Sequence, residues 1–344
     1  MSPQLTILQA GPALSLQDFG RPGYRAEGLT QGGAADPTAL YEGAALLGQA
    51  PNLAAIEMAG SGGTFRADSD LRIALTGAEM AAKIEGEAIV WNASHTLPAG
   101  ATLTIGGARN GSYGYLHVGG GFDTAPVMGS RAAHLAGGIG TLLQSGESLP
   151  IGPDKGHDTG MKITPIDRFG GGRIRIVASM QTASFDAATL DRFTACAFHR
   201  DARANRMGVR LGFEGEGYST DAALSIVSEV VVPGDIQISG DGAPYVLMYE
   251  CQTTGGYPRI GSVLPCDLPR VAQAQTGTDL HFEFVGMEEA ATLQARHLNE
   301  LKTLKSRVSP LVRDPARIRD LLSYQLISGA ISATSNPFEE GHPT

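Results

Sequence analysis

The stretch Gln252-Thr253-Thr254-Gly255-Gly256-Tyr257-Pro258 is a polar turn between two apolar runs, at residues 245–248 and 260–264. Short apolar runs separated by glycine indicate buried strands, so the turn favours a β fold. Its paired glycines let the backbone approach a ligand or another segment closely. The turn offers amide, hydroxyl and phenol groups but no strong acid or base. We interpret it as a surface for a planar polar group such as an amide or carboxylate, with an ordinary β-turn as the alternative.

The composition favours a β-rich protein with two domains or slightly more. The chain has 344 residues, of which 42% are hydrophobic, and it contains 46 glycines and 19 prolines. A net charge of −9 makes nucleic acid and anionic membranes unfavourable partners. We find no signal-peptide pattern, no apolar stretch near the ~20 residues of a membrane span, and no CxxC spacing among the cysteines. We therefore expect a cytoplasmic protein.

Two arginine-containing turns, one in each half of the chain, are candidate anion clamps. Asp18 and Arg21 flank a turn of glycine and proline, and Asn205 and Arg206 precede an alternating strand pattern. A guanidinium group offers a planar fork of donors that matches an anion or an amide. The alternatives are a salt-bridged loop for the first turn and an ordinary exposed arginine for the second.

A glycine pair precedes the most clearly marked helix of the first half. Asp36 is placed to cap this helix, Pro37 occupies its first position, and Gly48 follows its last residue. Free backbone N–H groups at a helix start can hold an anion, so Gly32 and Gly33 are candidate ligand-binding residues. Their spacing is not that of a Walker or Rossmann loop, so the signal for a nucleotide is weak.

Repeated strand patterns predict a duplicated barrel. A glycine turn followed by alternating apolar positions is what a barrel strand requires, because one face points inward and the other outward. This pattern occurs twice in each half, at residues 97–105, 143–151, 231–238 and 274–282. We place a linker in the glycine- and proline-rich residues 152–172 and amphipathic helices after Gly286, the last of them beginning at Asp314. The predicted domains are residues 1–165, 166–286 and a helical extension over 287–344.

The chain lacks several common catalytic patterns. It shows no HExxH, no His/Cys cluster and no EF-hand loop, so we expect no metal. The absence of a GxSxG elbow and of a P-loop gives no support for a serine hydrolase or a P-loop ATPase. Cys251 and Cys266 lie near the polar turn, where a small buried cysteine is the more usual interpretation. A general base remains open among the carboxylates near the predicted turns, which are Asp18, Asp36, Glu57 and Asp267.

Ordered motifs occur along residues 5–285. They lie at residues 17–24, 32–37, 75–78, 119–122 and 129–131 in the first half, and at 206–211, 232–237, 252–258 and 267–270 in the second. Together they resemble the biotin-dependent carboxyltransferase or allophanate-hydrolase-subunit-2-like family. This family includes the C subunit of 5-oxoprolinase, the regulator KipA and the carboxyltransferase domain of urea amidolyase. The chain departs from the family pattern at Phe19, where an aliphatic residue is common, and at Cys266.

The resemblance implies a mainly β fold of two cyclophilin-like β-barrels, with a site in the groove between them. It implies an ATP-dependent 5-oxoprolinase complex with a KipI-like B subunit and an A subunit, in which this chain binds and activates 5-oxo-L-proline. ATP is then a co-substrate of the complex, and no cofactor is covalently bound. The alternatives are a carboxyltransferase component of a biotin-dependent urea-type carboxylase and a KipA-like regulator that binds a KipI-like kinase inhibitor.

The resemblance also implies site residues at the matching positions. The expected catalytic residues are Asp18, Arg206 and Gln252. The expected substrate-binding residues are Arg21, Gly32, Gly33, Asn205, Gln237, Thr253, Thr254, Gly255, Gly256 and Tyr257. The substrate 5-oxoproline is a lactam with a carboxylate, so one of the two clamp arginines is expected to bind the carboxylate. The polar turn is expected to hold the lactam and polarise its carbonyl.

Overall fold

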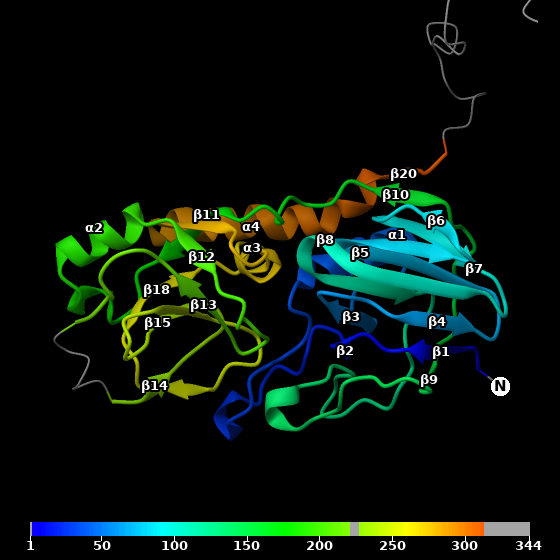
Figure 1. Ribbon diagram of the computed structural model, residues 1–344, viewed down its shortest axis with the longest axis horizontal. Coiled ribbons are helices and arrows are strands. Elements are labelled where there is room, and N and C mark those ends of the chain that lie inside the picture. The colour runs from blue at the N-terminus through cyan, green and yellow to red at the C-terminus, as the bar shows by residue number, and fades with distance from the viewer. Residues whose placement is uncertain (1, 221–226, 313–344) are drawn as a thin grey trace, which may run out of the picture.

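The computed structural model describes residues 2–220 and 227–312 (Figure 1). It confirms the mainly β class. The helices are α1 (Pro37–Leu47), α2 (Ala187–Ala195), α3 (Leu268–Gln273) and α4 (Met287–Thr303). The strands of the first half are β1 (Gln4–Gln9), β2 (Leu14–Gln17), β3 (Ala55–Ala59), β4 (Thr64–Ala67), β5 (Leu71–Ile84), β6 (Glu87–Ile89), β7 (Ala93–Leu97), β8 (Thr102–Val118), β9 (Ser148–Pro150) and β10 (Met161–Ile163). Those that follow are β11 (Gly172–Val177), β12 (Phe198–Arg200), β13 (Gly208–Gly212), β14 (Glu229–Val230), β15 (Asp235–Ile238), β16 (Pro244–Leu247), β17 (Thr254–Gly255), β18 (Arg259–Val263), β19 (Asp279–Phe284) and β20 (Val308–Pro310).

The strands of the first half, together with β20, form one 11-stranded sheet that branches at β8, rather than the closed barrel expected from the repeats. The apolar runs at residues 103–105 and 115–118 resemble two strands, but both belong to the single long strand β8. β4 pairs with the start of β8, β3 pairs with its end, and β5 follows it along most of its length. A long strand can serve two partners because each occupies a different part of its edge.

The second half forms a closed barrel in the order β11-β18-β15-β16-β13-β12-β19, which confirms a barrel in this half. β11 and β19 close it as a parallel pair. Buried aromatic rings fill its interior, with Phe193 of α2 stacked on Phe282 and packed against Phe198. The polar turn lies between β16 and β18, as its flanking apolar runs predicted.

The two halves share one hydrophobic core. The cluster that fills the barrel also contains Ala35, Tyr113 and Tyr115 of the first half. A second cluster lies within the first sheet and includes Leu5, Phe65 and Leu116. Because the larger cluster crosses the boundary, the barrel and the sheet are packed against each other.

The helix ends lie where the sequence signals predicted them, but the expected side-chain capping hydrogen bond is not always formed. Asp36 precedes α1, Pro37 opens it, and Gly48 ends it with a φ of 64° in the left-handed region that favours glycine. The Asp36 side chain makes no capping bond. Asp186 before α2 does cap its helix, since its carboxylate accepts from Thr189 N–H at 2.7 Å.

The segment from α4 to β20 runs along one side of both halves (Figure 1). α4 occupies the predicted helical residues, and β20 beyond it pairs with β10 of the first sheet. The helix predicted to begin at Asp314 lies outside the described residues. Nothing in the described ranges is a helix long and apolar enough to cross a membrane. The predicted domain boundaries remain predictions.

Candidate functional site

Two adjoining hollows lie on either side of the segment that carries Asn205 and Met207. The first, here called the barrel hollow, has a volume of about 620 Å³ and is lined by barrel residues. The second, here called the junction cavity, has a volume of about 360 Å³ and is lined by both halves. Asn205 and Met207 line both of them. The two hollows therefore belong to one continuous region at the meeting point of sheet and barrel.

The barrel hollow contains many of the sequence-predicted site residues. Asn205, Gln237, Gln252 and Tyr257 all line it. They come from the segment before β13, from β15 and from the turn between β16 and β18. Sequence reasoning therefore identified side chains that are distant in the chain and adjacent in space.

A pair of side-chain amides lies in this hollow. Gln252 Nε2 donates to Gln237 Oε1 at 3.3 Å. Gln237 is only 3% exposed, and its Nε2 has no hydrogen-bond partner. A buried donor without an acceptor costs about 1–3 kcal/mol, so such a group is usually satisfied by a ligand or water. The amide pair can therefore bind a polar ligand with little further loss of free energy from desolvation.

The rest of the polar turn shapes the hollow through its backbone. Thr253 O accepts from Val231 N–H at 3.0 Å, and Thr254 pairs with Val230 in the β14–β17 ribbon. Gly255 lies against Gln237, since a Cβ at Gly255 would come within 2.4 Å of Gln237 Nε2. The absence of a side chain there leaves room for the Gln237 amide. Neither the two threonines nor Gly256 is among the residues that line the hollow.

The junction cavity contains an arginine held by carboxylates from both halves. Arg206 Nε donates to Glu250 at 2.5 Å, and its Nη1 pairs with Glu57 of β3. Its Nη2 donates to Gly33 O at 2.5 Å. Glu57 also accepts from Tyr115 Oη at 2.7 Å. This triad ties the barrel to the first sheet at the wall of the cavity.

The electrostatics of this triad correct the role expected for Arg206. Burial by itself lowers the pKa of Arg206, but the neighbouring carboxylates of Glu57 and Glu250 outweigh it and raise the pKa above its ordinary value. The guanidinium therefore stays charged, and two carboxylates already occupy it. An anionic ligand would meet one positive and two negative charges here, so Arg206 is poorly suited to bind a substrate carboxylate.

Asp18 and Arg21 do not form the expected clamp, and in the described part of the chain no ion pair joins them. Asp18 accepts from Ser130 Oγ at 2.6 Å and from Arg131 N–H at 2.7 Å. Arg21 is 1% exposed and donates to the carbonyl of Ala132. Burial lowers the pKa of Arg21, while Asp18 opposes this effect. Both side chains hold the loop at residues 127–132, and neither lines a hollow described here.

The glycine pair before α1 is also used internally. Gly32 N–H donates to Tyr249 O at 3.1 Å, and Ala35 N–H donates to Glu57 at 2.7 Å. Gly33 supplies the carbonyl that Arg206 binds. The N–H groups of Gly32, Ala34 and Ala35 are therefore occupied by protein acceptors. They place the first-half loop against the segment that leads into the polar turn.

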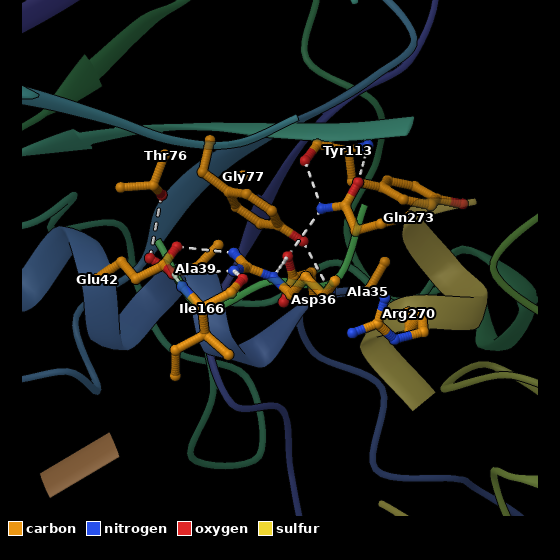
Figure 2. A network of polar contacts seen from close by, with 12 residues as sticks. Ala35, Asp36, Ala39, Glu42, Thr76, Gly77, Tyr113, Ile166, Arg270 and Gln273 are labelled. Atoms are coloured by element: carbon orange, nitrogen blue, oxygen red, sulfur yellow. Dashed lines mark hydrogen bonds and ion pairs between the residues drawn. The ribbon is translucent and has the colours of Figure 1, made fainter. Parts of the chain in front are cut away.

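A second, deeper network anchors this junction (Figure 2). Arg168 of the linker pairs with Asp36 at 2.6 Å and with Glu42 of α1 at 2.7 Å. Gln273 of α3 donates to the same Asp36 carboxylate at 2.7 Å. Asp36 N–H donates to Tyr115 Oη at 2.8 Å, and this hydroxyl in turn contacts the cavity triad. Buried polar contacts thus run from the linker to the cavity.

Sequence reasoning missed Glu250 and Arg168. Glu250 follows the apolar run at residues 245–248 and precedes the polar turn, so a charged residue beside a buried strand was its available signal. Arg168 lies in a stretch interpreted only as a linker. Its role depends on contacts to α1 and α3 that no local pattern reveals. In the residues that the structure describes, no cluster of His, Cys, Asp or Glu could hold a metal ion.

The chain belongs to the carboxyltransferase domain family, subdomains A and B, whose pattern matches residues 27–284. This confirms the family suggested by the motifs. Among curated proteins, it is 36% identical over 297 residues to the 5-oxoprolinase C subunit of Escherichia coli K12, covering 85% of this chain and 94% of that protein. The corresponding protein of Haemophilus influenzae is 32% identical over 85% of this chain and 95% of its own length.

Solved structures agree on the fold. The crystal structure of TTHA0988 superposes with a TM-score of 0.74 and 29% identity, covering 82% of this chain and 56% of that one. The urea amidolyase of Kluyveromyces lactis gives a TM-score of 0.78 at 20% identity, covering 92% of this chain and 21% of that one. At that identity the second likeness shows the fold alone.

Proposed function

We propose that this chain is the C subunit of an ATP-dependent 5-oxoprolinase and that its barrel hollow binds the lactam 5-oxo-L-proline. The relatives named as C subunits of 5-oxoprolinase support this role, since the alignment covers nearly their whole length. The structural observation that carries the proposal is the amide pair of Gln237 and Gln252, with its buried, unpartnered Nε2.

The amide pair is complementary to a lactam. A five-membered lactam is a cis amide, so its N–H and C=O lie on the same edge of the ring. Gln237 Nε2 donates to the lactam oxygen, and Gln252 Oε1 accepts from the lactam N–H. Donation to the carbonyl oxygen polarises the C=O bond, as donors do in an oxyanion site. A primary amide offers the same pattern, which makes the hollow selective for amides as a class.

The ring opening takes place in the complex. ATP phosphorylates the lactam oxygen, water adds to the activated carbon, and the ring C–N bond breaks to give glutamate, ADP and phosphate. This chain holds and polarises the lactam, while an A subunit and a KipI-like B subunit complete the catalytic machinery. As proposed, the complex is cytoplasmic and this chain is inactive alone.

The test compares matched variants in the reconstituted complex. ATP hydrolysis should depend on added 5-oxoproline, and Gln237→Leu should reduce the lactam-dependent rate about 10-fold or more, because it removes the buried donor. Gln9→Leu, an exposed glutamine on β1, is the control and should leave the rate unchanged. Unchanged turnover in Gln237→Leu, or ATP hydrolysis that ignores 5-oxoproline, would contradict the proposal.

The family match favours one alternative, a carboxyltransferase that works with separate biotin-carrier and carboxylase chains. Carboxylated biotin and urea are also planar amide-like groups, so the same hollow suits them. The discriminating measurement is transfer of labelled carboxylate from a carboxybiotinyl carrier to urea by this chain. Transfer without any response to 5-oxoproline would favour this alternative.

A further inference from the structure

A third hollow, of about 530 Å³, carries a single charged side chain. This Arg200 hollow shares Ala59, Tyr113 and Ala204 with the junction cavity. It therefore continues the same groove from the junction cavity, at residues that do not line the barrel hollow. Among its lining residues Arg200 alone is charged.

The backbone of Arg200 is fixed at the edge of the barrel. Arg200 is the last residue of β12 and pairs with Leu211 of β13. Its carbonyl accepts from Gly277 N–H at 3.1 Å, and its own N–H reaches Thr278 O at 3.4 Å. Ladder and turn bonds therefore hold the side chain at the junction.

The guanidinium of Arg200 has no hydrogen bond or ion pair with any described residue, and its Nε is buried without a partner. Three other arginines near the junction or in the barrel are paired: Arg206 with Glu57 and Glu250, Arg175 with Asp267, and Arg259 with Asp235. Arg21 also lacks an ion pair in the described residues, but it donates to the backbone carbonyls of Val127 and Ala132. Burial lowers the pKa of Arg200, and the side chain of Tyr113 gives only a partial offset. A partly buried charge without a counter-charge costs stability, so a bound anion would remove that cost.

The chemistry of the hollow defines the anion. A guanidinium fork matches the two oxygens of a carboxylate. One positive charge neutralises a monoanion, whereas a phosphate dianion would need further cations. Gln275 and Thr276 also line the hollow, and their side chains make no hydrogen bond within the described ranges. They can bind the outer oxygen or a polar substituent of the ligand.

We propose that Arg200 binds a small planar carboxylate or bicarbonate at this end of the groove. The proposal rests on the proposed function only for the identity of that anion, since both 5-oxoproline and its product glutamate carry carboxylates. Arg21 and Arg206, the arginines expected to bind a carboxylate, are less available for this role, because the first is buried against backbone carbonyls and the second is occupied by two glutamates.

The experiment measures saturable binding to the purified full chain at constant ionic strength, with acetate, L-glutamate, bicarbonate and inorganic phosphate as probes. At least one of the first three should bind more tightly than phosphate. Arg200→Gln should weaken that binding about 10- to 100-fold, and Arg200→Lys should restore part of it. Arg173→Gln, an exposed arginine of β11, is the matched control and should bind like the parent chain.

The neutral lactam 2-pyrrolidinone separates this proposal from the proposed function. Pyrrolidinone binding that needs Gln237, together with carboxylate binding unchanged in Arg200→Gln, would overturn the Arg200 assignment alone. If carboxylates bind in a way that needs Arg200 but pyrrolidinone does not bind, the Arg200 assignment is supported and the proposed lactam function is overturned. Binding of none of the small anions would also overturn it and would favour an acidic side chain of another protein in the complex. Thermal unfolding of Arg200→Gln should occur at the same temperature as in the parent chain or higher, because the variant loses an unpaired charge; lost binding would then not be lost folding.

Discussion

Two arginine–dicarboxylate triads lie at the junction and differ in their access to water. In the first, Arg168 holds Asp36 and Glu42, with side-chain exposures of 4% for the arginine and 0% for both acids. In the second, Arg206 is 12% exposed between its two glutamates and lines the junction cavity. Tyr115 connects them through one hydroxyl group.

The comparison teaches that the same grouping of charges serves two purposes. The sealed triad joins the linker, α1 and α3, so its role is to fix how the sheet meets the barrel. The cavity triad joins β3 to the segment before the polar turn, so it also sets the shape of the site. Removing either arginine leaves two buried acids. The cavity triad lines the larger hollow, of about 360 Å³ against about 170 Å³ beside Arg168, and both of its glutamates face that space.

The largest expected effect follows from Arg168→Met. Asp36 and Glu42 then remain buried without their counter-charge, which should lower the free energy of unfolding by about 3–5 kcal/mol. Urea denaturation followed by circular dichroism measures the loss. Arg173→Met is the control, because its pair with Glu283 is exposed and should be worth less than about 1 kcal/mol. Equal losses in the two variants would show that the sealed triad does not hold the junction.

Arg206→Met should cost less, about 2–3 kcal/mol, because water in the cavity can solvate the freed glutamates. The same denaturation experiment compares it with Arg168→Met. Adding Glu57→Gln and Glu250→Gln to Arg206→Met should restore most of the stability, since no buried charge then lacks a partner. A loss equal to that of Arg168→Met, without rescue, would remove the distinction between the triads.

The pH dependence of the free energy of unfolding tests whether the buried region around α1 excludes a charge that has no partner. His117 lies beside Thr76 and α1, and burial lowers its pKa from 6.5 to about 3. Below pH 6.5, His117 binds a proton in the unfolded chain, whereas in the folded chain it stays neutral until the pH approaches 3. Stability should therefore fall as the pH drops from 6.5 towards 3, with His117 contributing up to about 1.4 kcal/mol per pH unit.

His117→Gln should flatten this dependence, as measured by urea midpoints between pH 7 and pH 5. His281→Gln, at an exposed position on β19, is the control and should keep the parent slope. An unchanged slope in His117→Gln would mean that this histidine is protonated in the folded chain.

The smallest expected effect on stability is that of Gly255→Ala, which tests the barrel hollow without disturbing either triad. The added Cβ would meet Gln237 Nε2 at 2.4 Å, and the flexible end of the amide can move away. Stability should change by less than about 1 kcal/mol, while lactam binding should weaken about 10-fold. Gly170→Ala, where nothing lies within 4 Å, is the control. Binding that survives in Gly255→Ala would argue against the Gln237 donor.

Sequence patterns predicted the residues of the barrel hollow better than the contacts in the junction cavity. Gln237, Gln252 and Tyr257 were predicted together because polar residues on glycine turns beside strands stand out locally. Arg206 was predicted as a free cation but is paired with two glutamates. An unpaired and a paired arginine look identical in sequence, because the partners come from other parts of the chain, Glu57 from β3 and Glu250 from the turn after β16.

The sequence by itself determined the mainly β class, the ends of α1, the position of α4 and the polar turn, because glycine, proline and apolar spacing act over a few residues. Only the tertiary structure decided that the first half is a branched sheet, that Asp18 and Arg21 hold a loop, and that Arg200 lacks a partner among the described residues. Which charges meet depends on packing between segments that are from 44 to more than a hundred residues apart, and local patterns carry no information about contacts over such separations.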